Sequence, residues 1–315
     1  MLYKQLGRTG LRISALGLGG STFGPHVVHH ADEALTHQII HRAMDLGVNH
    51  LDTADMYSNS ISEEYIGRAL VGRRPRVVLA SKFSAKFGDG PNDYGSSRAR
   101  MMASVEASLK RLQTDYLDVY YLHVFDPLTP MEESLRGLDD LVRQGKIRYP
   151  ACSNYAGWQI MKAHWVADRR GYVPFVVVQS KYNLLDRGLE RDVVPACREV
   201  GMGLVPYYPL AAGVLTGKYK RGEPIPPNTR GVDNANVRSL LTDRNLALVE
   251  KLGEFAAARG HTSGELAIAW LVAQSHVSSV ITGNTTIEQL EQNVRASEWA
   301  LTPAEIAEID RLTLA

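Results

Sequence analysis

Four polar residues whose types suit proton transfer lie at or just after the ends of apolar runs in this chain of 315 residues. Asp52 follows the run ending at Leu51, Lys82 and His123 end two later runs, and Tyr57 lies shortly after Asp52. A buried carboxylate needs a cation or a hydrogen-bond donor, and Lys82 is available to Asp52. An ammonium beside a phenol favours the phenolate, so we expect Lys82 to lower the pKa of Tyr57 from ~10 to roughly 7–9. Together these residues predict a general acid–base site, whereas each alone would also suit a structural role: an ion pair, a rim aromatic or a hydrogen-bonded histidine.

Further polar residues end other apolar runs in the same way. In a parallel barrel the carboxyl ends of the strands meet at one face, so such side chains would share one cavity. They are Gly20 and Ser21, Ser153 and Asn154, Gln179, Tyr207, and Gly283 with Asn284. The segment from Gly283 to Thr286 also leads into a predicted helix, whose free N–H groups could bind an anion with charge from Lys218 and Arg230.

Other chemistries find little support. No G-x-S-x-G sequence marks a serine nucleophile, and Cys152 and Cys197 lie in segments typical of core thiols. His37 and His41 have the spacing of half a metal site without further ligands nearby, so we expect a solvated helix face and no metal.

The composition favours a small-molecule partner. The 35 Lys and Arg residues against 34 Asp and Glu give a net charge of +1, which offers no footprint for nucleic acid or an anionic membrane. Hydrophobic residues make up 44% of the chain and charged residues 22%, a mixture typical of globular proteins. Because there are two cysteines, no apolar leader and no long apolar run, we expect a cytoplasmic protein.

Short β-branched runs alternate with amphipathic stretches along the chain. About eight strands are predicted, at Ala15–Leu18, Val48–Leu51, Val77–Ser81, Leu117–Leu122, Ile147–Cys152, Val176–Gln179, Leu204–Tyr208 and Val277–Thr282. Capping signals begin helices after Thr129 (Met131–Gln144), Thr262 (through Gln274), Thr285 (through Ser297) and Thr302. Strand then helix, repeated without a linker, predicts an α/β fold, a (β/α)8 TIM barrel made by residues 1–315 as a single domain.

Two segments fall outside this repeat. Leu2–Gln5 and Leu11–Ser14 flank a glycine-bounded turn, which predicts an N-terminal β-hairpin that caps the bottom of the barrel. Ala211–Leu241 is rich in glycine and proline, so we expect an irregular loop that folds over a ligand. A doubly wound dinucleotide-binding fold is the competing architecture, but its G-x-G-x-x-G fingerprint is incomplete at Gly17–Thr22.

Several of these motifs resemble those of the aldo-keto reductase superfamily, over nearly the whole chain from Leu2. The motifs are Asp52-Thr53-Ala54-x-x-Tyr57, Ser81-Lys82, Tyr121-Leu122-His123 with Asp126-Pro127 and Thr129-Pro130, Ser153-Asn154, Gln179, Pro209-Leu210-x-x-Gly213 with Thr216-Gly217-Lys218-Tyr219, and Gly283 with Gln289 and Asn293. The resemblance implies a barrel that binds NADPH without a Rossmann fold, and a catalytic tetrad of Asp52, Tyr57, Lys82 and His123. The chain is similar to bacterial members and to the potassium-channel β-subunit branch, which share the Gly217-Lys218-Tyr219 segment.

The same resemblance implies a set of cofactor-binding residues. They are Gly20, Ser21, Asp52, Ser153, Asn154, Gln179, Tyr207, Tyr208, Pro209, Leu210, Ala212, Gly213, Lys218, Arg230, Gly283, Asn284, Thr285, Gln289, Gln292 and Asn293. Ser153, Asn154 and Gln179 would hold the nicotinamide, Tyr207 would stack on its ring, and residues 211–241 would form a cofactor-clamping loop.

The chain departs from the family pattern at three positions. Ser58 stands where the family usually has glycine, and Tyr208 stands where it often has serine, which would narrow the pocket. Pro150 lies in the fifth predicted strand and removes a ladder N–H, so we expect a local irregularity that disturbs Ser153 and Asn154.

The resemblance implies an NADPH-dependent oxidoreductase that reduces an aldehyde or ketone, a keto-sugar among the candidates, with Tyr57 as general acid. The partner is then a small-molecule carbonyl substrate, and both a monomer and a homo-oligomer are open. One alternative is a cofactor-binding regulatory subunit like the channel-associated barrels, in which asparagine tends to replace His123. Another is a non-redox barrel that binds a phosphorylated ligand.

Overall fold

A computed structural model describes residues 1–25 and 30–314. Its central strands are β3 (Leu16–Gly19), β4 (His50–Asp52), β5 (Val78–Phe83), β6 (Leu117–Leu122), β7 (Ile147–Ser153), β8 (Val177–Lys181), β9 (Gly203–Tyr207) and β10 (Val280–Gly283). They pair in parallel in the order β10-β3-β4-β5-β6-β7-β8-β9. Leu204 at one edge bridges Val277, just before the other edge strand, and its N–H donates to the His276 carbonyl at 2.8 Å. The sheet is therefore a nearly closed barrel, which confirms the predicted fold class.

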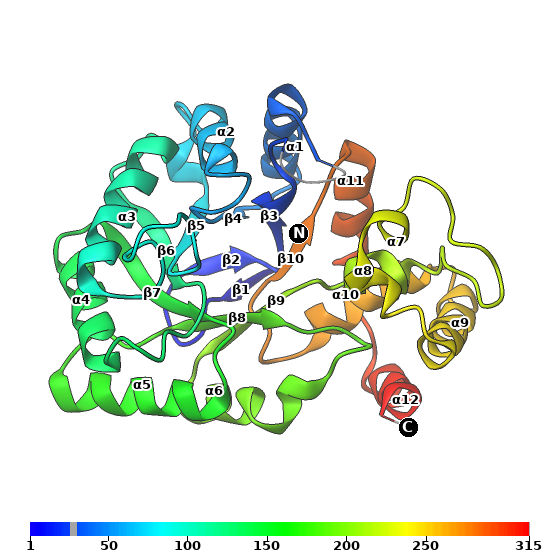
Figure 1. The fold of residues 1–315 in the computed structure, drawn as a ribbon. Helices are drawn as coiled ribbons and strands as arrows, with labels where there is room; N and C mark the ends of the chain where they lie inside the picture. The colour runs from blue at the N-terminus through cyan, green and yellow to red at the C-terminus, as the bar shows by residue number, and fades with distance from the viewer. Residues whose placement is uncertain (26–29, 315) are drawn as a thin grey trace.

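Helices lie between the strands and surround the barrel (Figure 1). They are α1 (Glu33–Asp45), α2 (Ile61–Ala69), α3 (Arg98–Leu112), α4 (Met131–Arg143), α5 (Gly157–Arg170), α6 (Val193–Val200), α9 (Asp243–Ala257), α10 (Ser263–Ala273), α11 (Ile287–Ala296) and α12 (Pro303–Thr313). Short 3₁₀ helices are η1 (Gly20–Thr22), η2 (Arg74–Arg76) and η3 (Gly188–Arg191).

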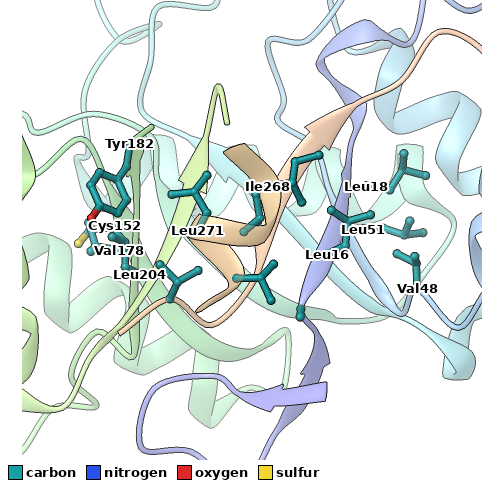
Figure 2. Close-up of a cluster of buried hydrophobic side chains, with 14 of the residues drawn as sticks. Leu16, Leu18, Val48, Leu51, Cys152, Val178, Tyr182, Leu204, Ile268 and Leu271 are labelled. Carbon is teal, nitrogen blue, oxygen red and sulfur yellow. The ribbon is translucent and has the colours of Figure 1, made fainter. Parts of the chain in front are cut away.

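The two faces of each barrel strand supply two hydrophobic cores. In β5, Val78 and Ala80 belong to the cluster inside the barrel, whereas Leu79 and Phe83 pack against the helices. This alternation follows from the period of two along a strand. Figure 2 shows part of the outer cluster, where strand side chains such as Leu16 lie with side chains of α10 such as Leu271.

The N-terminal hairpin caps the barrel as predicted. Strand β1 (Tyr3–Gln5) pairs antiparallel with β2 (Arg12–Ser14), and Leu6 and Ile13 join the cluster inside the barrel. The Lys4 ammonium donates to the carbonyls of Val272 at 2.5 Å, Gln274 at 3.2 Å and Val277 at 2.9 Å. The hairpin is thus fixed at the amino-terminal ends of the strands, opposite the predicted site.

Most predicted strand boundaries move by one to three residues, mainly toward the carboxyl end. Asp52, Lys82 and Ser153 consequently lie inside the hydrogen-bonded ladder instead of after it, and Gln179 lies within its strand instead of at the end. Their backbones are therefore held by neighbouring strands, which fixes the directions of their side chains.

The capping predictions are partly wrong. Thr262 and Thr302 form complete capping boxes as predicted. Thr129 instead donates its hydroxyl to Asp126 at 2.5 Å and leaves Pro130 as the N-cap of α4. Thr286, not Thr285, caps α11 by accepting from the Gln289 N–H at 3.2 Å.

The segment Ala211–Leu241 is more regular than predicted. It contains η4 (Ala211–Thr216), α7 (Arg230–Asp233) and α8 (Ala235–Arg238). In Figure 1 its later part, drawn in yellow, extends to one side of the barrel near α9. The glycines and prolines limit helix length without abolishing helices.

Pro150 causes a one-sided irregularity. It stays in register with Tyr120 of β6, so β7 is continuous on that side. On the other side the β7–β8 register begins only at Cys152, because proline has no N–H to donate. Pairing is restored before Ser153, whose placement is therefore not disturbed.

Candidate active site

The centre of the site is a buried ion pair. The Lys82 ammonium lies 2.5 Å from one carboxylate oxygen of Asp52 and donates to the Thr53 carbonyl at 2.8 Å. The other Asp52 oxygen accepts from the Gln179 amide at 2.8 Å. Burial lowers the pKa of Lys82, but Asp52 and Tyr57 outweigh it and leave this pKa above its ordinary value. Lys82 therefore carries a fixed positive charge.

Tyr57 places its hydroxyl over this charge. Its oxygen lies 3.3 Å from the Lys82 nitrogen, and its side chain is half-buried. Burial raises the pKa of Tyr57 and Asp52 raises it further, and together they exceed the lowering by Lys82. The predicted fall to roughly 7–9 is wrong because it gave too little weight to desolvation. Tyr57 is consequently a protonated phenol at neutral pH.

His123 stands beside Tyr57 with its ring edge-on. The ring centroids are 5.8 Å apart with an interplanar angle of 79°. The backbone N–H of His123 donates to the Phe83 carbonyl at 2.7 Å and fixes the position of the residue. Burial and the nearby Lys82 charge lower the pKa of His123 to about 3. The neutral imidazole has one N–H to donate, and its Nδ1 has no hydrogen-bond partner in the described part of the chain.

The turn after Tyr57 is strained. Ser58, Asn59 and Ser60 all have positive φ, at 48°, 51° and 74°. The left-handed conformation costs about 1–2 kcal/mol for each residue that has a Cβ. The Ser60 hydroxyl offsets part of this cost by donating to the Asp55 carbonyl at 2.8 Å. The departure at Ser58 therefore falls where the backbone itself favours glycine.

A cavity of about 520 Å³ opens above these residues. Its lining includes most of the predicted site: Ser21, Asp52, Tyr57, His123, Ser153, Asn154, Gln179, Tyr207, Tyr208, Pro209, Leu210, Ala212, Gly213, Lys218, Arg230, Gly283, Thr285, Gln289, Gln292 and Asn293. Gly20, Lys82 and Asn284 are not in the lining and lie buried behind it. Gly19, Thr22, Thr216, Asn228, Thr229, Ile281 and Thr282 also line it but were not predicted.

Five of the lining residues that sequence reasoning missed fall into two kinds. Gly19, Ile281 and Thr282 are strand residues. Ile281 and Thr282 were interpreted as framework although they immediately precede the predicted Gly283, and Gly19 was considered only as part of an incomplete dinucleotide fingerprint. Asn228 and Thr229 lie in the loop segment whose fold no local pattern predicts. For Asn228 and Thr229 the available signal was their position directly before Arg230.

The middle of the cavity is a polar network. The Tyr207 hydroxyl donates to the side-chain oxygen of Asn154 at 2.8 Å, and the side-chain NH₂ of Asn154 donates to the backbone carbonyl of His123 at 3.1 Å. Asn154 adopts φ 59°, a left-handed conformation that asparagine tolerates better than most residues. The network orients Tyr207 and ties it to the strand end that carries His123.

The far end of the cavity is suited to an anion. Lys218 and Arg230 line it, and neither has a carboxylate at ion-pair distance within the described residues. Gly213 has φ 97°, and a Cβ there would come within 3.0 Å of the Lys218 ammonium. Nearby, the Asn293 side chain of α11 donates at 2.7 Å to the side chain of Asn284, which precedes that helix. Two unpaired cations beside a helix N-terminus form an electropositive pocket.

Outside the cavity, His37 and His41 are each within hydrogen-bond distance of an α2 carbonyl, Tyr65 at 3.2 Å and Ala69 at 2.9 Å. Among residues 1–25 and 30–314, no three histidine, cysteine or acidic side chains are grouped as a metal would require. In the same ranges no helix has the length and apolar character to cross a membrane.

The chain belongs to the aldo/keto reductase family, whose model matches residues 15–313. It is 36% identical to an uncharacterized oxidoreductase, YrpG, of Bacillus subtilis strain 168, with 96% of this chain and 92% of the relative covered. It is 39% identical to a probable voltage-gated potassium channel subunit beta of Oryza sativa subsp. japonica, covering 98% and 96%. It is also 36% identical to the L-glyceraldehyde 3-phosphate reductase of Escherichia coli K12, covering 99% and 92%.

Proposed function

We propose that this protein is an NADPH-dependent reductase of aldehydes or ketones. The observation that carries the proposal is the 3.3 Å contact between the Lys82 ammonium and the Tyr57 hydroxyl at the floor of the cavity. A protonated phenol next to a permanent positive charge can give up its proton to a developing alkoxide. Oxidoreductase relatives that match most of this chain support the same reaction class.

The lining of the cavity supports the assignment of a nicotinamide adenine dinucleotide phosphate as the cofactor. Its polar centre at Ser153, Asn154 and Gln179 offers amide and hydroxyl groups to a carboxamide, while Lys218 and Arg230 offer charge to phosphates. Both cations are unpaired among the described residues, so binding phosphate would cost no existing ion pair. When bound, the cofactor supplies a hydride.

The side chains of the site then deliver the proton to the substrate. Tyr57 donates its phenolic proton to the carbonyl oxygen, and Lys82 stabilises the phenolate that remains. Asp52 keeps Lys82 charged and in place, at the cost of partly offsetting its field. His123, neutral at physiological pH, donates one hydrogen bond to the same oxygen and orients the carbonyl.

A second candidate is a cofactor-binding regulatory subunit, favoured by the 39% and 38% identity to probable potassium channel subunits of rice and Arabidopsis thaliana. It requires no turnover. His123 argues against it, since the resemblance assigns asparagine to that branch.

The test is a two-part measurement on wild-type protein. Titration with NADPH should change cofactor fluorescence, and initial rates across aldehydes, ketones and keto-sugars should show at least one good substrate. Tyr57→Phe should keep the fluorescence change and lose at least ~10²-fold in rate, the low end for general acid catalysis. Binding without turnover of any carbonyl would favour the regulatory subunit, and no binding would refute both.

A further inference from the structure

A second group of buried charges lies under the turn that carries Tyr57. Glu63 of α2 is fully buried and fully bonded: one oxygen accepts from Arg111 at 2.6 Å and the other from the Ser81 hydroxyl at 2.5 Å. Asp55 in the turn and Arg100 of α3 are also buried, with 3% and 8% of their surfaces exposed. If Asp55 and Glu63 are both ionised, their two negative charges equal the two positive charges of Arg100 and Arg111.

The Asp55–Arg100 pair is the loose one. The nearest guanidinium nitrogen lies 3.9 Å from the Asp55 carboxylate. The other Asp55 oxygen and the Arg100 Nε have no hydrogen-bond partner in the described part of the chain. The two opposite charges thus face each other without a direct hydrogen bond, and each keeps an unpartnered polar atom. Their attraction depends on the ionisation of Asp55, since a protonated Asp55 carries no charge.

Arg100 binds a loop on the substrate side of the barrel. Its guanidinium donates to the Ala85 carbonyl at 2.7 Å and the Asn92 carbonyl at 3.4 Å. Both belong to residues 84–95, named here the β5–α3 loop. The base of this loop is joined to the strand end that carries His123, because the Ser84 hydroxyl donates to the Val124 carbonyl at 3.1 Å. Phe87 and Tyr94 project from the loop and are about half exposed.

Asp55 in turn is joined to the catalytic groups through its backbone. Its N–H donates to the Lys82 carbonyl at 3.0 Å, and its carbonyl accepts from the Ser60 hydroxyl on the far side of Tyr57. A displacement of Asp55 is therefore passed to the strained turn that carries Tyr57.

We propose that Asp55 is a positioning residue: its carboxylate, paired with Arg100, holds the β5–α3 loop against the Tyr57 turn, and this attachment is tighter when Asp55 is ionised. The expected effect of Asp55 on turnover rests on the proposed carbonyl reduction. The attachment of the loop does not.

The surroundings of Asp55 place its titration near neutrality. Burial and the charge of Glu63 raise the pKa of Asp55 to about 7, against the lowering by Arg100 and Arg111. Tyr120 of β6 also faces this cluster, and burial holds its pKa well above the usual value, so it stays neutral. The net charge of the cluster thus changes through Asp55 in the physiological range.

Hydrogen exchange of the cofactor-free protein tests the attachment without any activity. Corrected for intrinsic rates, exchange of amides in the β5–α3 loop should slow by roughly tenfold between pH 6 and pH 8, equal to about 1.4 kcal/mol. Asp55→Asn and Arg100→Gln should remove this pH dependence. The matched controls Asp89→Asn, an exposed acid in the same loop, and Arg98→Gln, an exposed arginine of α3, should keep it. Equal loop exchange in wild type and both test variants at pH 8 would overturn the proposal.

Kinetics then test the consequence for substrate. In wild type the KM for an aldehyde should fall as pH rises through about 7 while kcat changes less. Asp55→Asn should hold KM at its high value at both pH values, with cofactor affinity unchanged. A wild-type pH profile retained in Asp55→Asn would refute the positioning role. Absence of turnover in wild type would instead defeat the proposed function and leave the exchange result to decide the attachment.

Discussion

Replacement of Lys82 by methionine removes the ammonium that lies 3.3 Å from the Tyr57 oxygen. At this distance and an effective dielectric of about 20, an ammonium and a phenolate attract by ~5 kcal/mol. The Asp52 carboxylate, 2.5 Å from the same ammonium, opposes part of this field. We therefore expect proton delivery to slow by roughly 10²–10³-fold, less than the ~10³·⁷-fold that ~5 kcal/mol alone would give.

The assay is single-turnover hydride transfer to a good aldehyde at saturating NADPH. Lys82→Met leaves Asp52 buried without its partner, which costs about 3–5 kcal/mol of stability. The double variant Asp52→Asn/Lys82→Met removes both charges and should lose rate by a similar factor while folding more stably. Lys86→Met, in which the lost ammonium is exposed and paired with Asp89, is the matched control. A folded double variant that reduces the aldehyde at close to the wild-type rate would refute the role of Lys82.

Three further outcomes are expected. Arg230→Ala should weaken NADPH by roughly 2–3 kcal/mol and NADH far less, as judged by fluorescence titration; equal losses would remove Arg230 from the 2′-phosphate. Limited proteolysis should cut within residues 211–241 and saturating NADPH should protect them, and cleavage indifferent to cofactor would exclude a clamp. The pKa of Asp55 is about 7 in the folded state against an ordinary 3.8, so the unfolded chain releases this proton at lower pH than the folded protein. The free energy of unfolding of the wild type therefore falls as pH rises from 3.8 to 7. The free energy of unfolding of Asp55→Asn relative to wild type should therefore rise by up to about 4 kcal/mol across that range and stay constant above it, as measured by urea denaturation at several pH values. A difference in unfolding free energy that does not change with pH would contradict the raised pKa.

Local chemistry was sufficient for much of the framework. Strand cores, the hairpin and the capping boxes at Thr262 and Thr302 depend on residues within a few positions of one another, and these predictions are confirmed. The polar residues at successive strand ends also predicted part of the cavity lining, because parallel strands bring their carboxyl ends to one face. Other lining residues, such as Leu210, Gly213 and Gln289, were implied only by the family resemblance.

Competition between alternative hydrogen-bond partners, and the asymmetric surroundings of single residues, decided the rest. The Thr129 hydroxyl could cap α4 or donate to the Asp126 carboxylate, and in the structure it donates to Asp126. Proline removed ladder bonds on only one side of β7, which no property of Pro150 itself specifies.

The electrostatics of the site depended most on tertiary structure. From the sequence, Lys82 was expected to lower the pKa of Tyr57, since charge types can be read from residue names. Burial reversed the direction, because desolvation depends on every element that packs over the phenol. Tertiary packing also brings Asp55 beside Arg100, although the turn and the helix that carry them are 45 positions apart in the chain. The sequence by itself determined which groups could exchange protons, and the packed barrel determined at what pH they do so.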